Sequence, residues 1–208
     1  MRLKHIKGAE ETVLHCDFVI QDCINYKGKF KELFQNDHPI HIEIGMGKGN
    51  FILNMALKNP TINFIGIEKY DSVLVKAIAK LEQMSLPNVR FIRMDATDIE
   101  SIFGKEIDTI YLNFSDPWPK ARHEKRRLMS ENFLKKYDSI FKEKKRIVMK
   151  TDNRHLFEFS IQSFTTYGYH IDHISLNLHE DRIDSIETEY EKKFSSLGYP
   201  IYWIEVSK

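Results

Sequence analysis

A single carboxylate in a rigid turn, followed by a cluster of cations, points most directly to chemistry. The turn is Asp116-Pro117-Trp118-Pro119, in which two prolines fix the backbone and remove two hydrogen-bond donors. The cations that follow are Lys120, Arg122, His123, Lys125, Arg126 and Arg127, with only Glu124 of opposite sign among them. Because a guanidinium fork suits phosphate oxygens, this stretch predicts a polyanion held against a reactive carboxylate. Taken alone, it leaves open a proline turn before a solvated helix face.

A glycine-rich turn is the second candidate. Glu43-Ile44-Gly45-Met46-Gly47-Lys48-Gly49-Asn50 follows the alternating apolar residues 40–44, which predict a strand. The dinucleotide fingerprint GxGxxG requires a third glycine where Asn50 stands. The pattern E-x-G-x-G-x-G instead resembles the cofactor loop of S-adenosylmethionine-dependent methyltransferases. That resemblance implies that Glu43 orients the methionine end of the cofactor through its ammonium group.

Two further acids end the next predicted strands. Glu68 lies about where a ribose presents its paired hydroxyls, and a carboxylate accepts from both. Gly66, inside the same strand, suggests a close approach to the backbone. Asp95 is placed to accept from an adenine amino group, while Ala96 offers a backbone donor. A lone acid at a strand end is more often a cap or a solvated turn, but three in register favour a nucleoside cofactor.

The elements that must position these residues alternate between strands and helices. Strands are predicted over 40–44, 62–67, 89–92, 107–112, 146–149, 169–176 and 201–206, and helical spacing over 51–56, 73–81, 133–141 and 156–164. This order predicts one domain over 1–208, an open, doubly wound α/β fold of mostly parallel strands. The last strand is expected to return antiparallel at an edge. Residues 1–38 form an extension that packs on the domain or contacts RNA, with short helical pieces over 13–24 and 30–34.

Composition sets wide bounds. The 208 residues are 42% hydrophobic and 29% charged, with a net charge of +1, so nucleic-acid binding would need a local patch. Two cysteines, Cys16 and Cys23, and the lack of a signal peptide or membrane-length apolar run predict a cytoplasmic protein. His170 and His173 lie three apart in a predicted strand and point to opposite faces, so no metal site is expected.

These motifs together resemble the bacterial tRNA (guanine-N7-)-methyltransferase family over about residues 40–206. The glycine turn is shared, as are FxDPWPKxRHxKRR at 114–127, Lys150-Thr151-Asp152, and T-x-Y-E at 188–191. The resemblance implies a class I methyltransferase fold with S-adenosylmethionine as cofactor, and tRNA as substrate, methylated on the variable-loop guanosine at tRNA position 46. It puts the catalytic role on Asp116, which is also counted among the cofactor-binding residues. Substrate-binding residues implied in the same way are Lys120, Asp152, Thr188, Glu189, Tyr190 and Glu191.

Methylation of guanine N7 requires no general base. The in-plane lone pair of N7 is unprotonated at neutral pH, so catalysis is orientation without a general base. A carboxylate at the guanine edge, for which Asp116 is the candidate, would favour the positive charge that passes to the purine. The basic residues Arg122, His123, Lys125, Arg126 and Arg127 are expected to contact RNA phosphates.

Three rival interpretations stay open on the sequence alone. The first is a methyltransferase acting on a small molecule or a protein. The second is an RNA-binding module that has lost catalysis, against which the four carboxylates Glu43, Glu68, Asp95 and Asp116 argue. A nicotinamide dehydrogenase is the weakest, for want of GxGxxG. A monomer and a homodimer are equally compatible with the sequence.

Overall fold

Seven strands form one mixed sheet in the computed structural model, which describes residues 6–181 and 186–208. The strands are β1 (Ile40–Ile44), β2 (Asn63–Glu68), β3 (Val89–Arg93), β4 (Ile107–Asn113), β5 (Phe141–Thr151), β6 (His170–Ser175) and β7 (Tyr202–Ser207), in the sheet order β3-β2-β1-β4-β5-β7-β6. The predicted α/β class is confirmed. β5 begins at Phe141, well before the expected residue 146. The earlier start was not predicted because residues 142–145 are charged and show no apolar alternation.

Strands β1 to β5 run parallel, and β7 runs antiparallel to both of its neighbours, β5 and β6. The antiparallel direction of the last strand is confirmed, but its expected place at the edge is wrong. β7 lies inside the sheet because its residues Trp203, Ile204 and Val206 are buried on both faces, whereas residues 170–174 of β6 are exposed. The more polar strand therefore takes the edge.

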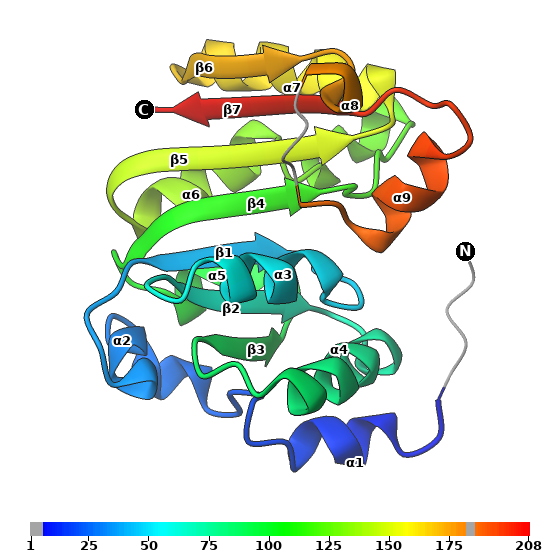
Figure 1. The fold of residues 1–208 in the computed structure, drawn as a ribbon. Helices are drawn as coiled ribbons and strands as arrows, with labels where there is room; N and C mark the ends of the chain where they lie inside the picture. The colour runs from blue at the N-terminus through cyan, green and yellow to red at the C-terminus, as the bar shows by residue number, and fades with distance from the viewer. Residues whose placement is uncertain (1–5, 182–185) are drawn as a thin grey trace.

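The order of the strands reverses between β1 and β4, which is where ligands bind in open α/β sheets, beyond the carboxyl ends. Figure 1 shows the arrowheads of β1, β2, β4 and β5 pointing to one side, while β7 points the other way. Helix α9 lies on the side of those arrowheads. The reversal therefore predicts a site between β1, β4 and α9.

Helices cover both faces of the sheet (Figure 1). The α-helices are α1 (Ala9–Leu14), α2 (Phe30–Phe34), α3 (Asn50–Lys58), α4 (Asp71–Met84), α5 (Ile99–Ile102), α6 (Glu131–Ile140), α7 (Arg154–Tyr167), α8 (Leu178–Asp181) and α9 (Glu189–Ser195), and the 3₁₀ helices are η1 (Cys23–Tyr26), η2 (Ala96–Asp98) and η3 (Ala121–Arg126). In the described ranges, no helix is both long and apolar enough to span a bilayer.

Two apolar cores follow from the alternation of strand side chains. Phe64 of β2 packs in one core with residues of α3 and α4, and its neighbour Ile65 packs in the other with residues of α6 and α7. In β1, Ile42 and Ile44 belong to the second core, so Glu43 between them points to the α3 side. This register directs a buried carboxylate toward the glycine turn.

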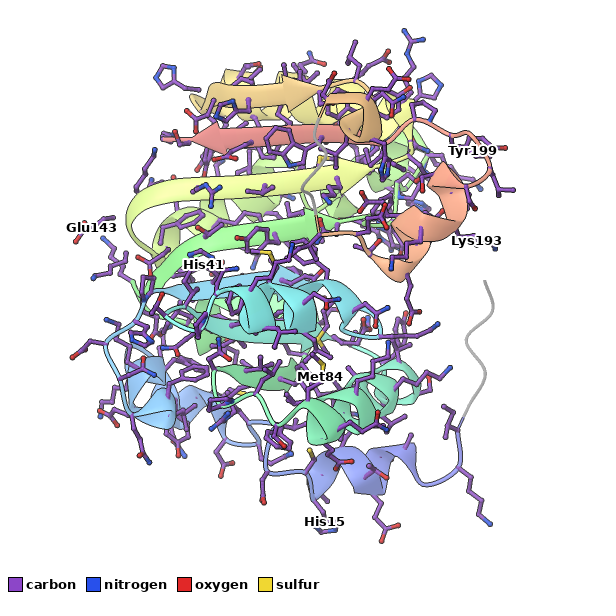
Figure 2. All side chains as sticks on the ribbon, viewed as in Figure 1. His15, His41, Met84, Glu143, Lys193 and Tyr199 are labelled. Atoms are coloured by element: carbon purple, nitrogen blue, oxygen red, sulfur yellow. The ribbon has the colours of Figure 1, made fainter. Side chains whose placement is uncertain are left out.

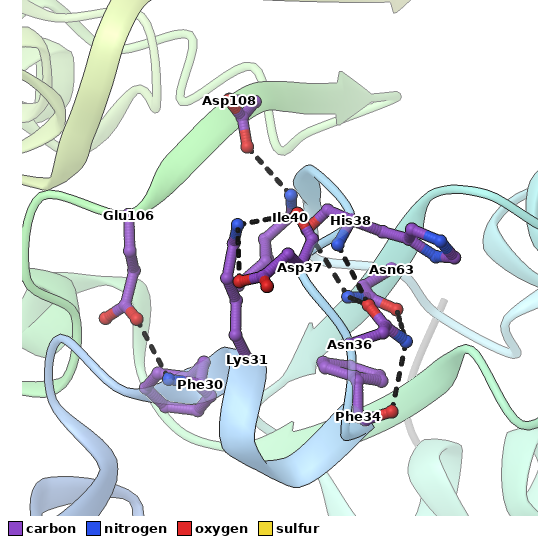
Figure 3. Close-up of polar contacts among 10 residues, drawn as sticks. All are labelled: Phe30, Lys31, Phe34, Asn36, Asp37, His38, Ile40, Asn63, Glu106 and Asp108. Carbon is purple, nitrogen blue, oxygen red and sulfur yellow. Dashed lines mark hydrogen bonds and ion pairs between the residues drawn. The ribbon is translucent and has the colours of Figure 1, made fainter.

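The N-terminal segment packs against the sheet in two ways. The carboxylate of Glu106 accepts hydrogen bonds from the backbone N–H of Gly28 at 2.7 Å and of Phe30 at 3.0 Å (Figure 3 draws the second). The helical piece expected over 13–24 is wrong: α1 ends at Leu14, and the chain then runs along the open edge of β3. Phe91 N–H donates to the Phe18 carbonyl at 2.8 Å, because the edge of β3 has backbone groups that need partners.

Candidate active site at the carboxyl ends of the strands

A pocket of about 330 Å³ opens at the switch point between β1, β4 and α9. Its lining residues are Glu43, Gly45, Met46, Gly47, Lys48, Asn50, Phe51, Asn113, Phe114, Thr188, Glu189, Tyr190 and Lys193. The glycine turn forms its floor, the end of β4 one wall, and the first turns of α9 its roof. Three motifs that are far apart in the sequence therefore meet around one cavity.

The glycine turn requires glycine for conformational reasons. Gly45, Gly47 and Gly49 have φ angles of 74°, 58° and 77°, which side-chain-bearing residues rarely adopt. A Cβ at Gly49 would also lie 3.0 Å from the Ala77 Cβ of α4. The close approach expected at Gly66 is made by the Met46 side chain, which occupies the space of the missing Cβ. The turn is thus packed tightly onto β2 and α4.

Glu43 lies on the floor of the pocket with 2% of its surface exposed. Its Oε1 accepts from the Asn113 amide at 2.8 Å, while Oε2 is buried and has no hydrogen-bond partner among the described residues. Burial raises the pKa of Glu43 to about 8, against the opposing effects of Asn113, the nearby Ile52 backbone N–H and Lys150. A buried acidic oxygen without a well-aligned donor, in a residue that lines a cavity, is suited to a cationic ligand group.

Glu68 holds the glycine turn from the neighbouring strand. Its Oε2 accepts from the Gly47 N–H at 3.1 Å, and its Oε1 from the N–H groups of Lys69 at 2.9 Å and Tyr70 at 3.1 Å. Burial raises its pKa, and the nearby charge of Asp116 acts in the same direction. The carboxylates of Glu43 on β1 and Glu68 on β2 therefore both lie at the glycine turn.

Asp95 lies two residues after β3 and faces a lysine. Its Oδ2 lies 2.6 Å from Lys69 Nζ, and its Oδ1 accepts from the Thr97 N–H at 3.0 Å as the cap of η2, which begins at Ala96. The hydrogen bond from Lys69 is the main cause that lowers the pKa of Asp95 to about 2. The carboxylate is ionised and partly exposed, so its remaining lone pairs are open to a donor such as an amino group.

The Asp-Pro-Trp-Pro corner is a strained turn. Phe114 and Trp118 have φ angles of 51° and 41°, in the left-handed region that bulky residues avoid. Asp116 between them is exposed. Strain of this kind persists only where surrounding contacts fix the backbone, and it is common at functional sites.

Arg127 supplies those contacts, which differs from its expected role at the RNA. Its Nε donates to the Pro117 carbonyl at 3.1 Å and an Nη to the Trp118 carbonyl at 3.2 Å. The guanidinium also lies 4.3 Å from the centre of the Phe159 ring, and only 13% of the side chain is exposed. Because these contacts engage the guanidinium from several sides, Arg127 is a clamp on the corner and is not free to grip a phosphate.

The other cations of the block differ from Arg127. The residues Lys120, Arg122, Lys125 and Arg126 are exposed, and His123 is half-buried. They lie on or next to the short helix η3. Arg126 stacks over Trp118 at 4.9 Å, and His123 meets the same ring edge-on at 5.7 Å. The indole thus orders one guanidinium and one imidazole on the open surface beside Asp116.

Helix α9 begins with the capping box of Thr188 and Glu191, and its first turn closes the pocket. Glu189, expected at the substrate, instead faces the cofactor turn: its carboxylate lies 2.6 Å from Lys48 Nζ and 2.7 Å from Lys80 Nζ. Partial burial would raise the pKa of Glu189, but the hydrogen bonds from both lysines outweigh it and hold the pKa at about 2. The residue latches α9 to the glycine turn and to α4.

Glu191 is fully buried and does not face the pocket, which also differs from its expected substrate contact. Its carboxylate pairs with Lys150 Nζ at 3.1 Å, and Lys150 also donates to the Ile186 carbonyl at 2.9 Å. Burial lowers the pKa of Lys150, although Glu191 opposes this. The pair fastens α9 to the end of β5.

Asp152 lies beside Tyr190, which lines the pocket. The Tyr190 hydroxyl is 3.5 Å from Asp152 Oδ2, and burial together with the Asp152 charge raises the pKa of Tyr190. The cap of α7 is Asn153, whose Oδ1 accepts from the Leu156 N–H at 2.9 Å. Asn153, and not Asp152, therefore caps α7.

Asn113 and Lys150 are functional residues whose roles the sequence did not reveal. A signal for Asn113 existed: Tyr111 pairs with Glu43 across the sheet, so Asn113, two residues further, points to the same face. No comparable signal existed for Lys150. A buried lysine in the motif Lys150-Thr151-Asp152 reads like an exposed one until its partner Glu191 is placed.

Comparisons with known proteins agree with this geometry. A family model described as "Putative methyltransferase" matches residues 37–204. A tRNA (guanine-N(7)-)-methyltransferase of Lachnoclostridium phytofermentans is 50% identical over 97% of this chain and 96% of its own length; that of Bacillus subtilis (strain 168) is 48% identical over 99% and 98%.

Solved structures show the same fold. An antibiotic-related methyltransferase superposes with a TM-score of 0.64 at 19% identity, covering 87% of this chain and 92% of its own. A SAM-dependent methyltransferase from Aquifex aeolicus reaches 0.58 at 11% identity over 98% and 99%. At these identities the likeness extends to the fold alone.

Proposed function

The chain belongs to the bacterial tRNA (guanine-N7-)-methyltransferase family, and from that premise we propose that it methylates N7 of a guanosine in tRNA, at position 46 of the variable loop, with S-adenosylmethionine as donor. The observation that carries the assignment is a pocket between a glycine cradle with an unsatisfied buried carboxylate and the strained residue Phe114, two residues before the exposed carboxylate of Asp116. Because its substrate is tRNA, the enzyme acts in the cytoplasm.

The chain's own groups suit an amino-acid tail and a nucleoside. Oε2 of Glu43 is the group that would meet the donor's ammonium, and the positive φ angles of the glycine turn let its backbone come close. Glu68 would meet the ribose, and Asp95 with Ala96 the adenine. When bound, S-adenosylmethionine supplies an electrophilic methyl group on a sulfonium. Every other part of the reaction is orientation and charge stabilisation by the protein.

Asp116 is the residue assigned to the guanine. Guanine N7 already carries a lone pair, so no proton need leave before transfer, and the protein needs only to hold the base in line. The Asp116 carboxylate would accept from the ring N–H and amino group of guanine, which favours the positive charge that the purine gains. Asp152 and Lys120, on either side, would hold the rest of the nucleotide.

The exposed cations beside the corner suit the tRNA backbone. Arg122, Lys125 and Arg126 point into solvent beside Asp116, and Trp118 orders the last of them. A net charge of +1 over the whole chain makes this cluster a local device that steers a polyanion to one place. RNA recognised in this way is read through shape and phosphates, and the chemistry is confined to one base.

The test is incubation with methyl-labelled S-adenosylmethionine and bulk tRNA, followed by digestion to nucleosides. The label is expected in 7-methylguanosine, and a tRNA transcript carrying adenosine at position 46 should accept none. Label in another nucleoside, label that does not need RNA, or no transfer at all would contradict the proposed function.

A further inference from the structure

Aromatic rings gather at the pocket mouth beside the corner. Phe114, directly after β4, and Tyr190 of α9 both line the pocket, and their ring centres are 5.0 Å apart. Tyr190 stacks at 4.2 Å on Phe194, which in turn meets Tyr199. Figure 2 places Lys193 on α9 and Tyr199 just after it, on the side to which the parallel strands point. Of these rings, Phe114 and Tyr190 line the pocket where a purine would have to lie, whereas Phe194 and Tyr199 lie outside its lining.

The backbone at Phe114 indicates that its ring is required. A φ of 51° is unfavourable for a residue with a bulky side chain, and glycine would adopt it without strain. The conformation is held by the hydrogen bond from Phe114 N–H to the Lys150 carbonyl at 2.8 Å. A position that needed only the turn would be best served by glycine, so the strain points to a use for the ring itself.

Tyr190 is held while part of it stays open. Phe194 supports its ring and Asp152 meets its hydroxyl at 3.5 Å, yet 44% of the residue is exposed. The capping box at Thr188 fixes the backbone that carries it. A large ring held from behind and exposed in front has the properties of a stacking platform.

We propose that Phe114 and Tyr190 are the stacking surface for the target guanine, an inference that rests on the proposed function. A base that enters the pocket leaves the RNA stack, and aromatic side chains replace the stacking it loses. The face of the Tyr190 ring, with the Phe114 ring tilted at 44° beside it, fixes the plane of the purine and so the direction of the in-plane N7 lone pair. As the purine becomes cationic, its attraction to the aromatic faces increases, which favours the transition state over the bound substrate.

The experiment compares five purified variants with the wild type. Phe114→Leu and Tyr190→Leu remove a ring but keep an apolar side chain, Phe114→Gly also relieves the backbone, and Phe114→Tyr keeps a ring. Tyr199→Leu is the matched control outside the pocket. Three quantities are measured for each: the single-turnover rate with saturating tRNA, the affinity for S-adenosylmethionine, and the melting temperature. A tRNA with 2-aminopurine in place of the target guanine reports stacking through fluorescence quenching.

Phe114→Leu and Tyr190→Leu are expected to lower the single-turnover rate about ten- to hundredfold and to reduce quenching, with cofactor affinity within about threefold of the wild type. Phe114→Gly should be as slow as Phe114→Leu despite its relaxed backbone, and Phe114→Tyr should recover most of the rate. Tyr199→Leu should match the wild type.

A wild-type rate in Phe114→Gly, or a loss of cofactor affinity that accounts for the whole defect, would overturn the stacking role. Failure of the wild type itself to form 7-methylguanosine would instead remove the proposed function, so the two failures are distinguishable.

Discussion

The carboxylates on the two sides of the site differ in their burial and in how they are held in place. On the β1–β2 side, Glu43 and Glu68 are buried, and their oxygens accept hydrogen bonds from Asn113 or from backbone N–H groups. On the β4–β5 side, Asp116 is exposed, and it is the backbone of its corner that is fixed, through Arg127. A small cofactor can enter a preformed, dry cradle, whereas a large RNA must reach its target group from solvent.

Three buried or partly buried ion pairs join the two sides of the site through α9. Lys150 pairs with Glu191 and also acts on the charge of Glu43, while Glu189 binds Lys48 and Lys80. Substitutions that remove these ion pairs should therefore affect both the cofactor side and the Asp116 side of the site. Substitutions on one side alone should leave the other side intact.

The largest effect is expected from Lys150→Met. Removing Lys150 leaves the buried Glu191 carboxylate with the Thr188 N–H at 3.2 Å and His179 Nε2 at 3.4 Å but without its cationic lysine, so the free energy of unfolding should fall by about 3–5 kcal/mol. Urea denaturation measures it. Adding Glu191→Gln to Lys150→Met should restore part of the loss, and a double variant no more stable than Lys150→Met would show that the two residues are not energetically paired.

The next effect separates two adjacent arginines. Arg127→Ala removes the donors to the Pro117 and Trp118 carbonyls and should lower the free energy of unfolding by about 1–3 kcal/mol. Arg126→Ala should leave stability unchanged and reduce the slope of log tRNA affinity against log salt by about one unit. Denaturation and filter binding at several salt concentrations test both. Equal salt slopes for Arg126→Ala and the wild type would reduce Arg126 to a surface residue.

A third effect concerns pH on the cofactor side. The folded pKa of Glu43, about 8, exceeds its usual 4.5, so the native state binds more protons than the unfolded state between these values. The free energy of unfolding of the ligand-free protein should fall as pH rises through that window. Glu43→Gln should flatten the dependence, as measured by denaturation at pH 5 to 8. An unchanged slope would mean that another group titrates.

Proton release on cofactor binding is a second test of the role of Glu43. A cationic ligand favours ionised Glu43, so binding of S-adenosylmethionine near pH 7 should release close to one proton. Calorimetry in buffers of different ionisation enthalpy detects it, and Glu43→Gln should abolish it.

The smallest effect is expected at the latch. Glu189→Gln removes a partly exposed ion contact to Lys48 and Lys80, so cofactor affinity should fall by no more than about 1 kcal/mol and the difference should vanish at high salt. Titrations at low and high salt check this. Glu158→Gln, which breaks the exposed pair with Arg154 on α7, is the matched control. A salt-independent loss would assign Glu189 a direct contact with the ligand.

Much of the fold is present in the sequence as local pattern. The alternation of residues 40–44 and the helical spacing around α3, α4, α6 and α7 predicted those elements because each buries one regular face. The place of β7 inside the sheet and the extended run of residues beside β3 were not predictable in this way. Both depend on which edge needs partners, a property of the assembled sheet.

The site was predictable where chemistry and position coincide along the chain. Glu43, Glu68 and Asp95 were found because each lies at or near the end of a predicted strand, and Asp116 because of its prolines. Arg127, Glu189 and Glu191 were expected at the substrate, but the structure turns them to the corner, the cofactor turn and the core. Charge in a sequence does not show which way a side chain points, since its partners come from distant segments.

If the β1–β2 side of the site binds the cofactor and the Asp116 corner acts on the target base, variants of the two sides should have different defects. The test measures cofactor affinity and the single-turnover rate at saturating cofactor for Glu68→Ala and Asp116→Asn. Glu68→Ala should weaken cofactor binding by about 1–3 kcal/mol yet regain a near wild-type rate when saturated. Asp116→Asn should keep cofactor affinity within about tenfold and transfer the methyl group about ten- to hundredfold more slowly. A wild-type rate in Asp116→Asn, or both quantities falling together in each variant, would contradict the account.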